Sequence, residues 1–155
     1  MTPKLTITPV REAHRDQLDR MAKGYFRELM PDGPPYVPQT LDRYWTDPGR
    51  HPYLIELDGA PIGFALVWNH PDGVHEMVEF TILPDHRQQG IGTQAAVLLF
   101  EALGGDWTLG VATHSPGGMA FWTRCLTASE TICGIAQGPP RTAHQQGSLS
   151  FRVLR

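Results

Sequence analysis

The feature that most constrains the fold is the segment His86–Thr93, HRQQGIGT, which joins a strand-like run to a helix-like run. It follows EMVEFTILP and precedes QAAVLLFEAL. Gly90 and Gly92 let the backbone approach a ligand without an intervening Cβ. The first N–H groups of a helix have no partner within it, and the helix dipole adds partial positive charge there. The junction therefore predicts an anion-binding turn, with a pyrophosphate as its ligand.

Two other phosphate-binding loops do not fit this junction. A dinucleotide-binding fingerprint needs G-x-G-x-x-G after the first strand, and only Gly90 and Gly92 are present here. A P-loop needs a lysine directly after its last glycine, and Thr93 stands there instead. The remaining alternative is an ordinary strand-to-helix turn without a ligand.

Hydrophobic periodicity predicts the elements around this junction. The expected strands are Leu5–Thr8, Tyr53–Leu57, Pro61–Trp68, Val74–Leu83, Trp107–Thr113, 130–136 and 147–154. The expected helices are Arg11–Leu29, Leu41–Trp45, Gly92–Leu103 and Gly117–Leu126, with a Pro- and Gly-rich loop over Met30–Thr40. The order β-α-α-β-β-β-α-β-α-β-β predicts a mixed α/β (α+β) fold, in which helices pack on one mixed sheet.

Composition narrows the class of protein. A chain of 155 residues with 41% apolar and 19% charged residues suits one globular domain spanning residues 1–155. The net charge of −3 gives no electrostatic reason to expect a nucleic acid or a membrane as partner. No apolar run reaches membrane-spanning length, and the first ten residues do not resemble a secretory leader, so the cytoplasm is the expected compartment. Cys125 and Cys133 fit neither a disulfide framework nor a metal-ligand spacing, and we expect no metal.

The junction also carries a family resemblance. Arg87–Gly92, RQQGIG, matches the [RQ]-x-x-G-x-[GA] signature of the GCN5-related N-acetyltransferase (GNAT) superfamily. The stretches YLIELDGAPIGFALV and VEFTILPDHRQQGIGTQAAVLLFEALGGDWTLGV, and then FW, resemble a group of small bacterial predicted acetyltransferases. The resemblance implies a GNAT-like acyl-CoA N-acyltransferase fold, acetyl-CoA as co-substrate and an amine of a small molecule or peptide as acceptor. It also implies a possible homodimer.

The resemblance assigns residues to the co-substrate. The backbone of Phe80–Ile82 would pair with the pantetheine arm as an extra strand. The N–H groups of Gln88–Thr93 would hold the pyrophosphate, and the strand Trp107–Thr113 would diverge from Val74–Leu83 to admit it. The full set of expected co-substrate residues is Phe80, Thr81, Ile82, Arg87, Gln88, Gln89, Gly90, Ile91, Gly92, Thr93, Ser115 and Trp122.

The general acid of the family is missing from this sequence. Many family members protonate the departing thiolate with a Tyr that lies seven residues after an Asn. Here Ser115 stands at the Asn position and Trp122 at the Tyr position. An indole N–H donates a hydrogen bond but does not supply a proton to a thiolate. Another residue or water would therefore protonate the thiolate, or the protein would be a non-catalytic acyl-CoA-binding sensor or regulatory module.

Three residues are candidates for the catalytic base. Glu79 has apolar neighbours in the sequence, which would raise its pKa toward neutrality. Glu76 aligns with the catalytic Glu of the histone acetyltransferases of the superfamily. On a regular strand the two carboxylates face opposite sides, so we expect at most one to face the site, and the resemblance favours Glu79. His114 is the third candidate, as a base or relay beside the thioester.

The acceptor is not determined by the sequence. Tyr25, Tyr36, Tyr44 and Trp45 come from elements that form the acceptor wall in the family, although Tyr25 and Trp45 are typical of core packing. Aminoglycosides, polyamines, amino acids and protein N-termini all remain open as acceptors.

Overall fold

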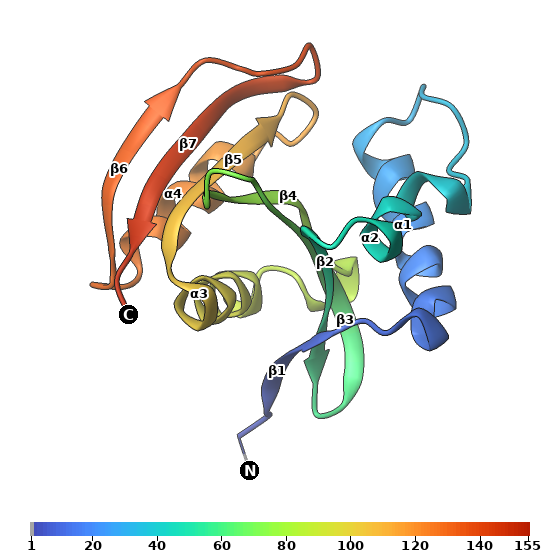
Figure 1. The fold of residues 1–155 in the computed structure, drawn as a ribbon. Coiled ribbons are helices and arrows are strands. Elements are labelled where there is room, and N and C mark those ends of the chain that lie inside the picture. The colour runs from blue at the N-terminus through green and yellow to red at the C-terminus, as the bar shows by residue number, and fades with distance from the viewer. Residues whose placement is uncertain (1) are drawn as a thin grey trace.

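The computed structural model describes residues 2–155. Within that range it contains one seven-stranded sheet and four α-helices in the predicted order (Figure 1). The strands are β1 (Leu5–Pro9), β2 (Arg50–Leu57), β3 (Ala60–Asn69), β4 (His75–Ile82), β5 (Gly105–Ala112), β6 (Ile132–Gly138) and β7 (Gln145–Val153). The helices are α1 (Arg15–Leu29), α2 (Arg43–Thr46), α3 (Ile91–Leu103) and α4 (Gly118–Thr127).

The two N-terminal helices begin later than the periodicity predicts. A 3₁₀ turn at Glu12–His14 precedes α1, so the α-helix proper starts at Arg15 rather than at Arg11. A second 3₁₀ turn, Pro38–Leu41, precedes α2, with proline in its first turn. Short 3₁₀ segments are common at helix starts, and the apolar spacing that predicts a helix does not distinguish the two types.

The sheet has the order β1-β2-β3-β4-β5-β7-β6. All neighbouring strands are antiparallel except β4 and β5, which are parallel. These two pair only over His75–Met77 and Trp107–Leu109. Beyond these residues they diverge, as the resemblance predicts, so the second half of β4 presents an unpaired edge toward β5 (Figure 1).

The two faces of the sheet are covered differently. The largest core cluster lies between the sheet and the helices α3 and α4, and it includes Phe100, Trp107 and Phe151. On the opposite face, α1 and α2 pack on β2 and β3 through a second cluster that includes Leu18, Tyr44 and Phe64. No helix covers β5 and β7 on that second face, within residues 2–155, and the two strands present polar side chains there (Figure 1).

None of the helices that the structure describes between residues 2 and 155 is long and apolar enough to cross a bilayer.

Candidate active site

The connection between β4 and α3 is the predicted anion-binding turn. After Ile82 the chain makes a 3₁₀ turn at Pro84–His86, and Gln88 and Gly90 then take left-handed backbone angles, with φ of 63° and 76°. Helix α3 begins at Ile91, and its first backbone bond runs from the Gln94 N–H to the Gly90 carbonyl. Within residues 2–155, the N–H groups from Gln88 to Thr93 have no acceptor. They form a row of free donors at a helix N-terminus, the arrangement that binds phosphate.

The two glycines of the turn serve different purposes. Gly90 has a positive φ, and a Cβ built there would meet nothing within 4 Å, so the backbone conformation and the open approach require it. A Cβ on Gly92 would lie 3.0 Å from Cε1 of Phe121 on α4. Close packing of α3 against α4 therefore explains Gly92. Its surroundings favour this packing role over the expected role of opening the backbone to the anion.

Arg87 ties the turn to the other side of the molecule. Its Nε donates to the Ile82 carbonyl at 2.7 Å, and its two terminal nitrogens donate to the Glu28 carboxylate of α1 at 2.8 and 2.7 Å. The paired charges lower the pKa of Glu28, with the hydrogen bond from Arg87 as the main cause. The side chain expected to contact the co-substrate is thus engaged by α1 and by the end of β4.

Along the edge of β4 that faces the opening, only every second residue directs its backbone N–H and C=O groups outward. The Leu83 N–H donates to the Ile62 carbonyl of the β3 side, and the register from Glu79 to Ile82 is regular. Alternation then directs the backbone groups of Thr81 toward β3, and those of Phe80 and Ile82 toward the opening. The Thr81 carbonyl indeed lies over Gly63 of β3. Of the three residues expected to pair with a pantetheine arm, Phe80 and Ile82 have the required direction and Thr81 does not. The Ile82 carbonyl already accepts from Arg87 Nε, so Ile82 offers its N–H.

A β-bulge changes the expected arrangement of the two glutamates. Leu66 pairs with Glu79 but Val67 pairs with Met77, so Val78 is an extra residue in β4. Glu76 pairs with Trp68, two residues from Leu66 and on the same face of β3. The bulge therefore places Glu76 and Glu79 on one face, toward α1 and α2. The expectation that they face opposite sides is wrong, because it assumed a regular strand.

Glu79 lies beside the point where β4 and β5 diverge. Its carboxylate accepts a hydrogen bond from the Tyr25 hydroxyl of α1. Burial raises the pKa of Glu79 to about 7, the Tyr25 hydrogen bond opposes that rise, and the charge of Glu76 adds to it. A carboxyl that titrates near neutrality can accept a proton from an ammonium group and release it again.

Tyr25 combines packing with this polar contact. Its ring packs edge-on against Phe26 and Phe64, with centroids 5.1 and 5.4 Å apart. The expectation of core packing holds for the ring but misses the hydroxyl, which reaches a residue 54 positions away. No local pattern in the sequence signals that contact. Trp45 contacts the Arg15 guanidinium at 4.5 Å from its ring centre.

The remaining predicted residues are more dispersed. Glu76 accepts a hydrogen bond from the His70 ring at 2.8 Å. Trp122 is 8% exposed and packs against Phe80 and Phe100, so its indole is a core side chain. Ser115 lies in the turn before α4, and its carbonyl accepts from the Gly118 N–H at 2.9 Å. His114 is exposed in that turn, and its ring has no hydrogen-bond partner within residues 2–155.

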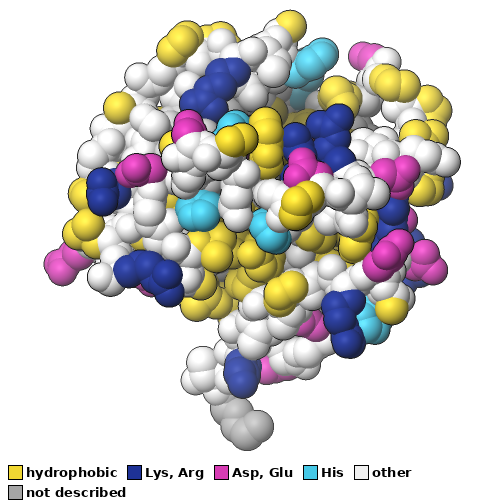
Figure 2. All heavy atoms as spheres, in the orientation of Figure 1, with side chains coloured by type: hydrophobic (Ala, Val, Ile, Leu, Met, Phe, Trp, Pro, Cys, Tyr) yellow, Lys and Arg dark blue, Asp and Glu magenta, His cyan; other side chains and the backbone are white. Residues whose placement is uncertain are grey.

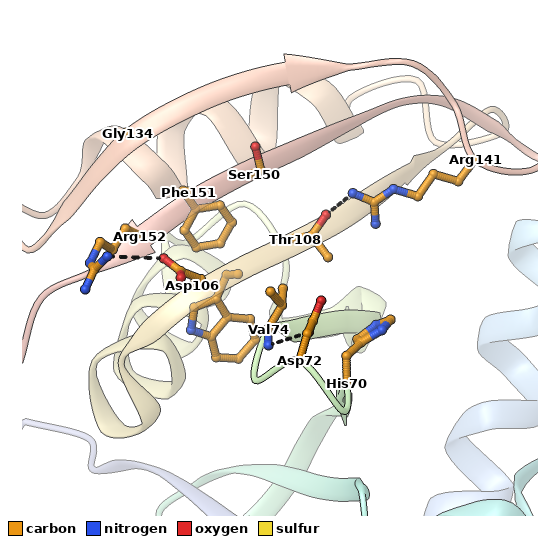
Figure 3. A pocket seen from close by; sticks show the side chains of 11 residues that line it. His70, Asp72, Val74, Asp106, Thr108, Gly134, Arg141, Ser150, Phe151 and Arg152 are labelled. Carbon is orange, nitrogen blue, oxygen red and sulfur yellow. Dashed lines mark hydrogen bonds and ion pairs between the residues drawn. The ribbon is translucent and has the colours of Figure 1, made fainter.

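A hollow of about 510 Å³ lies on the uncovered face of β5 and β7, and Thr108 in its lining pairs with Glu76 of β4. Its lining includes His70 from the end of β3, Thr108 from β5 and Arg141 from the connection between β6 and β7 (Figure 3). Acidic, basic and histidine side chains are interspersed on this side of the molecule (Figure 2). The residues of the hollow were not predicted from the sequence, because they come together from segments far apart in the chain.

The chain resembles known acetyltransferases both in sequence pattern and in fold. A profile of the Acetyltransferase (GNAT) family matches residues 15–126. No curated protein matches the chain significantly in sequence.

Solved structures share the fold at low sequence identity. An acetyltransferase from Thermus thermophilus has a TM-score of 0.71 and 20% identity, with 97% of each chain covered. A spermidine N-acetyltransferase from Vibrio cholerae, in complex with CoA and spermine, has a TM-score of 0.64 and 12% identity, covering 95% of this chain and 92% of that one. The PaiA N-acetyltransferase from Thermoplasma acidophilum, in complex with coenzyme A, has a TM-score of 0.63 and 10% identity, covering 97% and 99%.

The glycine turn at the start of α3, the parallel strands that diverge and the profile match over most of the chain agree with one another, and the protein belongs to the GNAT acetyltransferase family.

Proposed function

We propose that the protein is an acetyl-CoA-dependent N-acetyltransferase that acts on a primary amine by direct attack in a ternary complex. The observation that carries the proposal is the position of Glu79, whose pKa is about 7, at the bulge where β4 and β5 diverge. The free N–H groups of Gln88–Thr93 would bind the pyrophosphate. The backbone groups of Phe80 and the N–H of Ile82 would receive the pantetheine arm.

The chemistry follows from these positions. Acetyl-CoA supplies a thioester carbonyl carbon, and the amine must be neutral to attack it. Glu79 takes a proton from the bound ammonium, the amine nitrogen forms the new C–N bond, and the C–S bond breaks as the thiolate leaves. The second nitrogen proton is released as the amide forms, and water supplies the proton that the thiolate takes up. Trp122 cannot supply that proton.

Calorimetric titration with acetyl-CoA, followed by a free-thiol release assay over a panel of amines, tests this function. We expect binding of acetyl-CoA and thiol release with one class of amine. Absence of acetyl-CoA binding would refute the assignment of the turn at Gln88–Thr93.

A non-catalytic acyl-CoA sensor is the second candidate, and the buried indole of Trp122 at the position of the usual acid favours it. This alternative also predicts acetyl-CoA binding, but no thiol release with any amine. The same pair of measurements therefore separates the two functions.

A further inference from the structure

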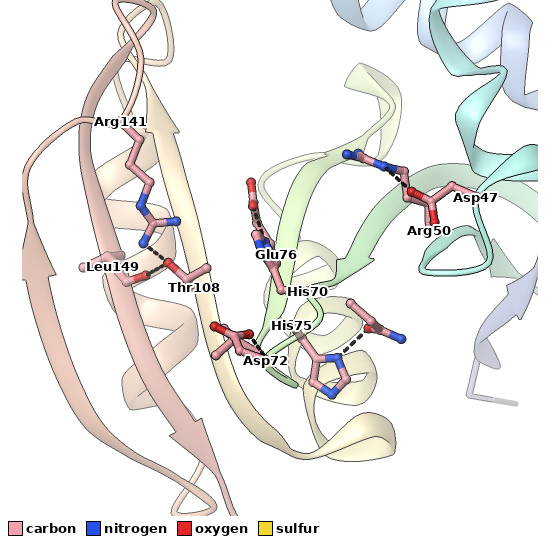
Figure 4. Close-up of polar contacts among 11 residues, drawn as sticks. Asp47, Arg50, His70, Asp72, His75, Glu76, Thr108, Arg141 and Leu149 are labelled. Carbon is pink, nitrogen blue, oxygen red and sulfur yellow. Dashed lines mark hydrogen bonds and ion pairs between the residues drawn. The ribbon is translucent and has the colours of Figure 1, made fainter.

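The acceptor class can be inferred from the charges around the hollow beside Glu76. We propose that the acceptor is an amino acid, a primary amine that carries a carboxylate, and that Arg141 and Arg50 bind this carboxylate; the inference rests on the proposed function. The two residues flank Glu76 in the sheet, because Arg50 pairs with Trp68 and Trp68 pairs with Glu76. On its other side Glu76 pairs with Thr108, which the Arg141 guanidinium contacts (Figure 4).

Arg141 reaches into the hollow from the connection between β6 and β7. One terminal nitrogen donates to Thr108 Oγ1, whose own hydroxyl donates to the Leu149 carbonyl at 3.2 Å. Thr108 is 7% exposed and stands beside Glu76 in the β4–β5 pairing, so the guanidinium is fixed at the level of Glu76. No carboxylate lies within ion-pair distance of Arg141 in residues 2–155, and a guanidinium has five N–H donors.

Arg50 faces the same space from β2. Its guanidinium carbon lies 4.2 Å from the centre of the Trp68 ring and 5.7 Å from that of Tyr44. The side chain is 11% exposed, and Asp47 lies 3.4 Å from its Nε. That Nε is nevertheless buried without a hydrogen-bond partner within the described chain. Stacking covers the faces of the guanidinium, and Asp47 lies beside its Nε, so a carboxylate ligand would bind at the terminal nitrogens.

The acidic groups around this space already have partners. Glu76 is bonded to His70, and Glu79 accepts from Tyr25. Asp106 lies 3.8 Å from Arg152, and Asp72 accepts from the Val74 N–H at 3.0 Å. This arrangement leaves Arg141 as the charge that a ligand would complete. Arg50, whose Nε lies 3.4 Å from Asp47, adds a second positive charge, and both arginines attract an anion.

The spacing suits a small amino acid. Glu76 and Glu79 pair with Trp68 and Leu66 of β3. These two partners are two residues apart, so the glutamates are separated by roughly 7 Å along the strand. An α-amino acid whose ammonium contacts Glu79 would place its carboxylate near the level of Glu76, once a hydrogen bond of about 2.8 Å is added at each end. A polyamine would instead place a second cation beside the two guanidinium groups.

The test compares amino acids with the amines that differ from them only by the missing carboxylate. Tyrosine with tyramine, phenylalanine with phenethylamine and lysine with cadaverine are assayed for thiol release with acetyl-CoA. We expect the amino acid of at least one pair to have the higher kcat/KM, by about tenfold or more. Higher kcat/KM for the decarboxylated member of every pair would overturn the inference and leave the proposed function intact. Thiol release with other amines of the panel, but with neither member of any pair, would also overturn the inference and leave the proposed function intact. No thiol release with any amine, despite acetyl-CoA binding, would remove the function and the inference together.

The variant Arg141→Gln tests the residue. It should lower kcat/KM about ten- to a hundredfold for the preferred amino acid, mainly through KM, and leave that of the matched amine almost unchanged. Arg141→Lys should restore part of the loss, because it keeps the charge but not the planar fork. The control is Arg11→Gln, which removes the same charge from an exposed residue outside the hollow and should change kcat/KM by less than about twofold. An equal loss on the amino acid and on its matched amine would assign Arg141 a structural role and overturn its part in binding.

Discussion

The β4–α3 turn lies at one end of β4 and the side chains around Glu76 and Glu79 lie toward the other end, and the two regions are assembled in opposite ways. The turn consists of consecutive residues, Gln88–Thr93, and it acts through its backbone N–H groups. The residues around Glu76 and Glu79 come from distant segments: Tyr25 contacts Glu79 across 54 positions, and Arg141 contacts Thr108, the neighbour of Glu76 on β5, across 33 positions. A ligand common to a whole family can be held by the backbone, whereas a specific acceptor requires side chains that can vary independently.

The largest effect is expected from a substitution that disrupts the turn. Gly90→Asp should weaken acetyl-CoA binding by more than about a hundredfold, because it places a carboxylate among the donors that bind an anion. It also forces a side chain into a backbone with φ of 76°. Calorimetric titration measures the Kd. The control is Gly59→Asp, at φ of 82° in the open turn between β2 and β3, which carries the same strain without the ligand. Equal Kd values for the two variants would refute the turn as the pyrophosphate site.

The next effect separates catalysis by Glu79 from acetyl-CoA binding at the turn. Glu79→Gln should lower kcat about a hundredfold or more and leave the Kd for acetyl-CoA unchanged, since the amide cannot take a proton from the ammonium. Thiol release and calorimetry give the two values. Glu56→Gln, on β2 away from the opening, is the matched control. An unchanged kcat in Glu79→Gln would transfer the role of base to Glu76 or His114.

A smaller effect concerns the pH at which the base titrates. Because the deprotonated form of Glu79 is active and its pKa is about 7, kcat/KM should fall about tenfold per pH unit below that value and level off above it. Tyr25→Phe removes a hydrogen bond that lowers the pKa of Glu79, so the midpoint should move to higher pH. Glu76→Gln removes a charge that raises this pKa, so the midpoint should move to lower pH.

Tyr53→Phe is the control for the loss of a phenol. A midpoint that stays in place in both Tyr25→Phe and Glu76→Gln would mean that Glu79 is not the titrating group.

The smallest effect tests whether the two glycines of the turn differ. Gly92→Ala should lower the free energy of unfolding by about 1 kcal/mol, since its Cβ would lie 3.0 Å from the Phe121 ring, partly offset by the helix preference of alanine. Acetyl-CoA binding should change little. Urea unfolding and calorimetry measure the two quantities. A large loss of binding without a loss of stability would return Gly92 to the anion site.

Much of the fold could be predicted, because each element carries its own hydrophobic period. The order of all strands and helices is confirmed, and so are the GNAT resemblance and the divergence of β5 from β4. The errors lie where a distant segment decides. The bulge at Val78 depends on the register between β3 and β4, and it reversed the expected facing of Glu76 relative to Glu79.

The sequence by itself determined the turn at Gln88–Thr93, because a helix start and a left-handed glycine are local properties of consecutive residues. It also determined that Trp122 cannot act as the usual acid, since an indole N–H donates a hydrogen bond but does not supply a proton in any fold. Only the tertiary structure decided which side chains surround Glu79, and that Arg50 and the Thr108 contact of Arg141 flank Glu76. Those contacts arise from the pairing of strands and the packing of helices that are distant in the chain, and no short stretch of residues encodes them.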